Sequence, residues 1–502
     1  MKNGTFAVIN IGASAFRMQI NEFINGESRM LEYLIKSLPI GKDTFNKRYI
    51  SLEAVRESAK IINSFMTKAR DYHTSKVVAV ATSGLREAVN RDFFIDYIHK
   101  NTGVMINILD PYEELFIRYT AFINEIEDID EIEKKGVIFA NVSSGNVAIT
   151  INSKKSIVYA EALPFGSLRL NEIFKHLDEK QKIKAFKNYV YNMLAEAKRI
   201  LLKEQPKVVF FTGSTVTILR SIFDPKKSEI NLKDLKKLLE IVSHMDTDTI
   251  SSTYGLRYNE AEILKAVLVT YLGIMEISGQ DKFHFSKTTF PHKLLLYYSK
   301  SYKKMNLTKY LESTLIYQGW KYNFDKNHAI AVKKHTKRLF NELKEIHNLP
   351  TKCLNLLEIA AITHDFGYFI NPNNHEYNSY YILKSMHLPG ISESDMNMVA
   401  LTALMHRGKD VEDYTAFFDL IKPEDLFLLK KMVALLRVGD SLDAGHKQSV
   451  KSFKVVKSTD MIKLDVEITD YIFLEEMSLQ KKSKLFENVF GVKIEIGKQT
   501  AS

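Results

Sequence analysis

The chain has 502 residues, enough for about three or four domains of ordinary size. Hydrophobic residues make up 45% of the sequence and charged residues 26%, which is typical of a soluble globular protein, and no run of about 18 apolar residues predicts a membrane span. The net charge of +10 admits a polyanionic ligand, although a generally Lys-rich surface explains it equally well.

Cysteine content and the N-terminus indicate the compartment. Cys353 is the single cysteine, so the chain has no internal disulfide and no thiolate cage for a metal. A lone cysteine fits a reducing cytoplasm. The first residues enter a strand directly, without a signal-peptide core. We therefore expect a cytoplasmic protein that contacts no membrane and no specific nucleic acid.

The first 125 residues alternate between predicted strands and helices. Three strands lead into an amphipathic helix at 52–72, whose apolar residues recur on one face. A strand at 76–84, a helix at 86–103, and a strand, turn and helix over 106–126 complete the pattern. The three opening strands are predicted at 5–12, 16–23 and 29–41.

The same order of elements returns from residue 136. A strand, a small-residue turn and two further strands cover 136–167, and a long helix follows at 179–204. A strand at 207–214 and a helix at 216–223 close the second half. This internal repeat of architecture predicts two facing α/β halves whose small-residue turns point into a shared cleft.

Beyond about residue 305 the pattern changes to helices alone, with histidines at intervals. From about residue 448, short alternating strands return around a helix at 481–489. We therefore expect an all-helical domain followed by a small α+β end piece. The four expected domains are residues 1–125, 126–304, 305–447 and 448–502.

Five segments carry the pattern of a known family. They are ATSGLREAVN (81–90), ILDPYEELFIRY, LPFGSLRLNEIF, FTGSTVTILRSI and AAITHDFGYFINPNNHEYNSYYIL. In this order they resemble the exopolyphosphatase and guanosine pentaphosphate phosphatase (Ppx/GppA) family. The resemblance implies an α/β fold with two ribonuclease H-like domains, of the actin and acetate-kinase type, facing a cleft. An all-α HD-type domain and the α+β end piece would follow.

The resemblance also implies an activity and its residues. The chain would be a phosphoanhydride hydrolase that releases terminal phosphate from inorganic polyphosphate or pppGpp, and it would form a homodimer. Arg17 and Arg86 would hold phosphoryl oxygens, and Glu114 would activate the attacking water. A solvated carboxylate at a helix N-terminus is the alternative for Glu114. The expected phosphate-binding residues are Asn10, Gly12, Arg17, Arg86, Asn141, Ser143, Ser144, Gly145, Gly213, Ser214 and Thr215.

Both phosphate loops depart from the family pattern. Asn10 and Asn141 stand where the family has Asp, although Gly12 and Arg17 are kept. Residues 286–295 also preserve little of the family's pattern. An amide keeps the size of a carboxylate but lacks its charge, and Mg²⁺ prefers anionic oxygen ligands. We expect a cleft that binds phosphate through a weakened or absent Mg²⁺ site.

The helical region holds a second set of functional candidates. Its histidines and aspartates follow the order of the metal ligands in the HD phosphohydrolase superfamily. The implied ligands are His328, His364, Asp365 and Asp440, with His375 and His406 as candidates for a second ion. Asp443 is an alternative to Asp440. Nitrogen and carboxylate ligands together suit Mn²⁺, Fe or Co better than Mg²⁺.

Three functions remain open at this point. The first is hydrolysis in the N-terminal cleft. The second is a metal phosphohydrolase in the HD-type domain, with a phosphate-sensing N-terminal half. The third is a non-catalytic protein that binds polyphosphate or (p)ppGpp. These three functions are distinguished by whether phosphate release depends on Glu114, on Asp365 or on neither.

Overall fold

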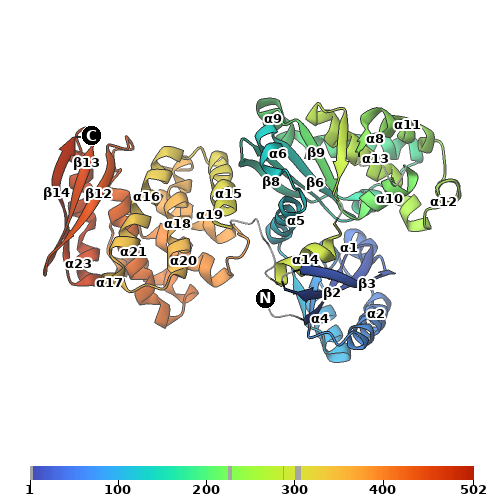
Figure 1. Cartoon of the computed structure of the whole chain (residues 1–502), viewed down its shortest axis with the longest axis horizontal. Coiled ribbons are helices and arrows are strands. Elements are labelled where there is room, and N and C mark those ends of the chain that lie inside the picture. Colours follow the sequence, from blue (N-terminus) through green and yellow to red (C-terminus); the bar gives the residue numbers. More distant parts are fainter. Residues whose placement is uncertain (1–3, 26, 224–228, 287, 300–306, 502) are drawn as a thin grey trace. The chain divides into compact units, whose positions relative to one another are not determined.

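The computed structural model describes residues 4–25, 27–223, 229–286, 288–299 and 307–501. The chain forms two compact units, residues 1–305 (unit 1) and residues 306–502 (unit 2). Unit 1 contains two mixed α/β halves, and unit 2 contains mostly helices and one small sheet (Figure 1). None of the described helices is both long and apolar enough to cross a membrane.

The first half of unit 1 is built on a five-stranded sheet in the order β3-β2-β1-β4-β5. β1 pairs antiparallel with β2 and parallel with β4. The strands are β1 (Gly4–Ile11), β2 (Ala15–Ile24), β3 (Glu27–Ser37), β4 (Lys76–Ala81) and β5 (Ile106–Ile108). The helices are α1 (Ile40–Lys47), α2 (Leu52–Asp71), α3 (Ser83–Arg86), α4 (Arg91–Thr102) and α5 (Pro111–Glu125).

The second half repeats this arrangement in a six-stranded sheet, β10-β11-β9-β6-β7-β8. β6 pairs antiparallel with β7 and parallel with β9, as β1 does with β2 and β4. The predicted internal repeat is therefore confirmed. The strands are β6 (Val137–Val142), β7 (Val147–Ser153), β8 (Ser156–Leu163), β9 (Val208–Thr212), β10 (Glu229–Asn231) and β11 (Lys282–Phe285). The helices are α6 (Ile129–Lys135), α7 (Ser167–Ile173), α8 (Glu179–Met193), α9 (Ala195–Glu204), α10 (Ser214–Ile222), α11 (Leu232–Ser243), α12 (Thr247–Tyr254), α13 (Tyr258–Ser278) and α14 (Phe290–Tyr298).

Helix α2 illustrates how sequence pattern becomes packing. The Ser51 side chain accepts a hydrogen bond from the Ala54 amide and so caps the first turn. Val55, Ile62 and Phe65 lie on one face and are buried in the core of the first half. The predicted amphipathic helix is confirmed because its apolar stripe has a sheet to cover.

Two long helices expected from the sequence are each divided. The segment 86–103 breaks between α3 and α4, because residues 87–90 are held by the loop before α2. The Asn90 side chain donates to the Ile50 carbonyl at 2.8 Å and accepts from the Ile50 amide at 3.0 Å. The Val89 amide donates to the Arg48 carbonyl at 2.8 Å. The second expected helix, 179–204, divides between α8 and α9.

Unit 2 begins with helices and ends with the sheet β12-β13-β14. Buried residues of both parts, such as Leu435 in a helix and Phe453 in a strand, belong to one hydrophobic core. The helices are α15 (Leu307–Lys321), α16 (Lys326–Glu342), α17 (Lys344–His347), α18 (Lys352–Thr363), α19 (His375–Ser385), α20 (Glu393–Leu404), α21 (Leu426–Ser441), α22 (Phe473–Lys482) and α23 (Lys484–Phe490). Short 3₁₀ turns are η1 (Phe366–Phe369), η2 (Val411–Leu420) and η3 (Pro423–Asp425). The strands are β12 (Val450–Lys457), β13 (Met461–Ile468) and β14 (Lys493–Ala501).

Candidate functional sites

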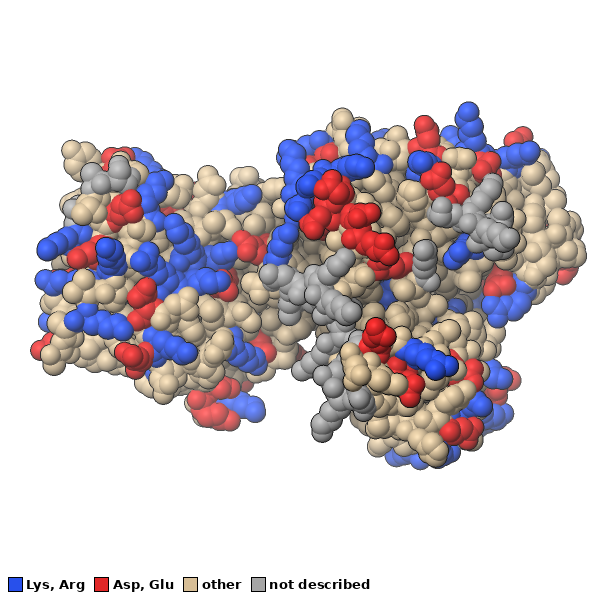
Figure 2. Space-filling model, viewed as in Figure 1, with Lys and Arg blue, Asp and Glu red and all other residues tan. Residues whose placement is uncertain are grey.

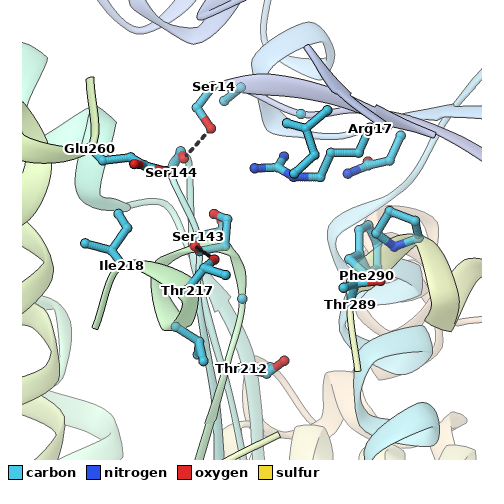
Figure 3. A pocket seen from close by; sticks show the side chains of 18 of the residues that line it. Ser14, Arg17, Ser143, Ser144, Thr212, Thr217, Ile218, Glu260, Thr289 and Phe290 are labelled. Carbon is cyan, nitrogen blue, oxygen red and sulfur yellow. Dashed lines mark hydrogen bonds between the residues drawn. The ribbon is translucent and has the colours of Figure 1, made fainter. Parts of the chain in front are cut away.

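A cavity of about 480 Å³ lies in unit 1 and is lined by loops of both halves. The turn after β1 contributes Gly12 and Ser14, and the turn after β6 contributes Ser143 and Ser144. Further lining comes from the start of α10 and from residues just before α14. Figure 3 shows, on one side of the cavity, Arg17, Thr289 and Phe290, and on the other Ser143, Ser144 and Thr217.

The two small-residue turns meet at this cavity. The Ser144 hydroxyl donates to the Ser14 hydroxyl at 2.9 Å, which links the halves of unit 1 (Figure 3). Gly145 lets the turn after β6 approach Ser83 of the first half, since a Cβ at residue 145 would lie 2.1 Å from the Ser83 hydroxyl oxygen. Short hydroxyl side chains therefore line the cavity where the two turns meet.

The charge of the lining favours an anion. Four arginines line the cavity, and Glu260 is the one carboxylate among the described lining residues. Glu260 forms an ion pair with Arg257. The arginines are Arg17, Arg118, Arg220 and Arg257. Because their charge exceeds that of Glu260, the cavity suits a phosphate group.

Glu114 lies in the first turn of α5 and is 2% exposed. Its Oε1 accepts from Arg118 Nη2 at 2.7 Å, and its Oε2 lies 3.4 Å from Arg86 Nη1. Burial acts to raise the pKa of Glu114, but the charges of Arg118 and Arg86 outweigh it and hold that pKa below its usual value. The alternative of a solvated carboxylate is wrong. Glu114 is also absent from the described lining of the cavity.

Arg118 is a residue that the sequence interpretation missed. Its Nη1 donates to Asn141 Oδ1 at 2.9 Å, and its guanidinium carbon lies 3.5 Å from the centre of the Phe290 ring. The residue is 5% exposed, yet it lines the cavity. Its spacing of four from Glu114 on one helix is the sequence signal that predicts their ion pair.

In unit 2, six side chains that are distant in the sequence converge. Groups of three offer ligand atoms that lie within 4.8 Å of one another. Asp365 belongs to two of these groups, and Asp440, rather than Asp443, belongs to the third. The converging residues are His328 in α16, His364 and Asp365 after α18, His375 at the start of α19, His406 after α20 and Asp440 in α21.

The histidine rings of this cluster face one another through Nε2. The Nε2 atoms of His328 and His364 are 3.3 Å apart, and those of His375 and His406 are 3.2 Å apart. Asp365 lies between the pairs, with Oδ1 2.9 Å from His375 Nε2 and Oδ2 3.7 Å from His328 Nε2. Because Asp365 contacts both pairs of histidines, its carboxylate is placed to bridge two cations.

The Nδ1 atoms show why these rings fit a metal. Nδ1 of His364 donates to the Ala361 carbonyl at 2.9 Å, and Nδ1 of His406 donates to the Ala403 carbonyl at 2.6 Å. Because those Nδ1 atoms each carry a proton, the Nε2 atoms are the ones that point into the cluster, where a cation would bind them. His375 is oriented in the same way by the carbonyl of residue 372.

Two carboxylates complete the surroundings of this cluster. Asp443 Oδ2 lies 3.0 Å from His328 Nδ1, so it orients that ring from behind. The Lys482 ammonium donates to Asp440 Oδ2. Burial acts to raise the pKa of Asp440, but Lys482 and the neighbouring histidines hold it well below its usual value. Asp440 is therefore an ionised carboxylate, as a metal ligand must be.

Comparisons with known proteins place this geometry in a family. A model of the Ppx/GppA phosphatase family matches residues 27–300, and a model of domain III of that family matches residues 312–487. The chain belongs to the Ppx/GppA phosphatase family. This membership, with the names of the relatives below, indicates a hydrolase.

Two curated relatives differ in how much they share with this Ppx/GppA protein. A guanosine-5'-triphosphate,3'-diphosphate pyrophosphatase from Pseudoalteromonas translucida is 22% identical and aligns over 96% of each chain. A bifunctional 3-dehydroquinate synthase/phosphatase from Fusobacterium nucleatum is 24% identical over 55% of this chain and 44% of its own length.

Solved structures support the fold of the N-terminal part. An exopolyphosphatase from Cytophaga hutchinsonii is 17% identical, with a TM-score of 0.54 over 60% of this chain and 99% of its own. The Aquifex aeolicus family member, also 17% identical, has a TM-score of 0.50 over 61% of this chain and 100% of its own. These neighbours fit an actin-like α/β fold for unit 1.

The structure places most of the expected phosphate-binding residues at the cavity. Thr215 is buried instead, and its hydroxyl donates to the Val142 carbonyl at 2.8 Å. Arg86 donates to the Leu109 carbonyl at 2.6 Å and lines a separate hollow. Asn141 is also absent from the lining. Those that line the cavity are Asn10, Gly12, Arg17, Ser143, Ser144, Gly145, Gly213 and Ser214.

The residues that line the cavity and those directly behind its wall do not fit the divalent metal that the family implies. Asn10 and Asn141 supply neutral amides where carboxylates would be needed. The Arg118 guanidinium already donates hydrogen bonds to Asn141 Oδ1 and to Glu114 Oε1. A second cation at those oxygens would be repelled by the guanidinium.

Proposed function

We propose that this Ppx/GppA protein removes terminal phosphate from inorganic polyphosphate or pppGpp in the unit 1 cavity. The observation that carries the proposal is a lining of hydroxyl and arginine side chains with a single carboxylate, Glu260, among the described residues. Such a lining offers hydrogen-bond donors and positive charge to phosphoryl oxygens. The relatives named for pppGpp and polyphosphate chemistry support the same substrate class.

Positioning and charge would supply most of the rate enhancement. Phosphoryl transfer passes through a loose transition state, so fixed donors on the equatorial oxygens count more than covalent participation. Arg17 and Arg118 would hold those oxygens, with Ser14 and Ser144 as hydroxyl partners. Water attacks the terminal phosphorus, and the shortened phosphate chain leaves with the bridging oxygen. Glu114 acts in this arrangement by orienting Arg118, since their ion pair turns its carboxylate away from the lining.

Orthophosphate release from polyphosphate and from pppGpp tests the proposal. Glu114→Gln should lower release about tenfold or more because Arg118 loses its orienting partner. Asp365→Asn should leave release in the presence of a chelator unchanged, and Glu131→Gln, at an exposed glutamate on α6, is the matched control. Loss with Asp365→Asn alone, in a parallel assay with Mn²⁺, would move catalysis to unit 2. No release from any sample, with chelator or with Mn²⁺, would contradict hydrolysis of these substrates at either site.

A second candidate function rests on unit 2. The convergence of four histidine Nε2 atoms with Asp365 and Asp440 favours an HD-type metal phosphohydrolase. His328, His364, Asp365 and Asp440 would hold one divalent ion such as Mn²⁺, and His375 and His406 would share Asp365 with another. A bound ion of this kind lowers the pKa of its water and makes it a nucleophile. We further propose a homodimer in the cytoplasm, which sedimentation and cell fractionation would test.

A further inference from the structure

The guanidinium of Arg118 occupies a special place in unit 1. It bridges α5 to the end of β6, between the carboxylate of Glu114 and the amide of Asn141. Asn141 is one of the two positions where the family pattern carries an acidic residue. A fixed positive charge therefore lies against one of the two positions where an amide replaces the family's carboxylate.

The surroundings of Arg118 leave this positive charge incompletely neutralised. Glu114 contributes one negative charge to the buried group, whereas Arg118 and Arg86 contribute two positive charges. The hydrogen bonds of Arg118 to described residues use three of its five N–H groups, on Nε, Nη1 and Nη2. Two N–H groups remain for a ligand in the cavity that this side chain lines.

The guanidinium is also held rigidly. The Phe290 ring stacks against one face, with 3.5 Å from the guanidinium carbon to the ring centre, and Glu114 fixes two of the nitrogens. A charge that is already oriented stabilises an incoming anion without the cost of reorganisation. Arg17 is held differently, by a hydrogen bond to the Ala15 carbonyl at 3.3 Å and by another to the Tyr33 side chain.

We propose that Arg118 supplies, from within the chain, the positive charge that a divalent cation would otherwise bring to the terminal phosphate. The unit 1 cavity then binds polyphosphate without a metal. This inference rests on the proposed phosphate-binding function of the cavity and names the residue that makes that function independent of Mg²⁺. The competing explanation is that the ion pair between Arg118 and Glu114 only stabilises the fold and does not bind a ligand.

Binding of inorganic tripolyphosphate to the full chain in the presence of EDTA tests this inference. The wild type should bind by calorimetry or equilibrium dialysis. The double variant Arg118→Met/Glu114→Gln removes both members of the Arg118–Glu114 ion pair, so that the charge of Glu114 is not left behind when that of Arg118 is lost. Its affinity should fall at least about tenfold because charge-assisted hydrogen bonds to phosphate are lost. Circular dichroism and the urea midpoint verify that the variant is folded.

Two further variants separate ligand binding from a structural role. Arg118→Lys keeps the charge but loses the planar fork, and its affinity should lie between those of the wild type and the double variant. Arg199→Met/Glu196→Gln removes an exposed Arg–Glu pair on α9 and should bind like the wild type. The inference is overturned if the folded Arg118→Met/Glu114→Gln variant binds like the wild type, or if the wild type binds only when Mg²⁺ is added.

Phosphate release by the same samples separates this inference from the proposed function. Metal-free binding that depends on Arg118, without any release of phosphate, contradicts hydrolysis and leaves the inference standing. If phosphate is released but tripolyphosphate binding does not depend on Arg118, the inference is contradicted. The proposed hydrolase activity is then still supported.

Discussion

Glu114 and Arg118 lie four residues apart on α5, and their pairing changes the chemistry expected of the cavity. The family resemblance implies that Glu114 activates water, but a general base needs an accessible carboxylate with a pKa near the working pH. Here the carboxylate is buried, its pKa is lowered, and its oxygens are bonded to arginine. The spacing predicts an ion pair, whereas the contact of Arg118 with Asn141 depends on how α5 packs on β6.

Lys293 is another residue whose state depends on its surroundings. It lies in α14 behind the cavity wall, where its ammonium donates to Thr212 Oγ1 at 3.1 Å and to Ser286 Oγ at 3.4 Å. Burial lowers its pKa to about 7, against the attraction of Glu125. Because this value lies below that of the unfolded chain, the unfolded state binds more protons between about pH 7 and pH 10.

The stability of unit 1 should therefore rise with pH in this window. The destabilising effect of Lys293 is complete below about pH 7 and disappears as the lysine of the unfolded chain also loses its proton. Urea unfolding of the wild type from pH 7 to pH 9, compared with Lys293→Met, should show a gain of up to about 1.4 kcal/mol per pH unit in the wild type alone. Parallel pH profiles for the two proteins would show that Lys293 keeps its ordinary pKa.

At the scale of elements, the turn from β9 into α10 is a tightly constrained part of the cavity wall. Gly213 has φ +113°, and a Cβ there would lie 2.2 Å from the Val142 carbonyl oxygen. Gly213→Ala should therefore lower the free energy of unfolding by about 2 kcal/mol or more and weaken tripolyphosphate binding. The measurement is urea unfolding of the full chain.

Gly279 provides the matched control for that substitution. It also has a positive φ, +66°, but a Cβ there would meet no atom within 4 Å. Gly279→Ala should cost about 1 kcal/mol for its left-handed backbone and leave ligand binding unchanged. Equal losses in the two variants would contradict the steric explanation for Gly213.

The elements themselves were largely predictable. Apolar segments on either side of a small-residue turn predicted the first two strands, and a helical pattern predicted α2, because its apolar face is buried. The break between α3 and α4 was not predictable, because it is imposed by hydrogen bonds from Asn90 and Val89 to a loop about 40 residues earlier. The short strand β11 (Lys282–Phe285) also escaped prediction, since four residues carry little periodicity.

At the scale of the whole molecule, two separate sites make separate predictions. Mn²⁺ should slow hydrogen exchange around His364 and His406 in unit 2 and leave the loops of the unit 1 cavity unaffected. At 100 times its dissociation constant, a bound ion stabilises the state that binds it by about 2.7 kcal/mol. Asp365→Asn should abolish this protection and the retention of Mn²⁺ after dialysis.

Protection of the unit 1 loops by Mn²⁺ would contradict the metal-free cavity. Protection of unit 2 in the Asp365→Asn variant would contradict the proposed ligand set. Charge on the surface does not distinguish the two sites: Lys and Arg predominate on the face of unit 2 in view, whereas both signs mix on unit 1 (Figure 2). The net charge of +10 is therefore no guide to which site holds phosphate.

Sequence alone was enough to recognise the family, the repeated halves of unit 1 and the order of histidines and aspartates in unit 2. Local periodicity and short motifs carry these features, and both can be recognised without knowing which distant residues are in contact. The tertiary structure decided what the side chains do. Packing of α5 against β6 set Arg118 between Glu114 and Asn141, and packing of five helices turned the Nε2 atoms of unit 2 toward Asp365. Such contacts join residues far apart in the chain, so no local pattern encodes them.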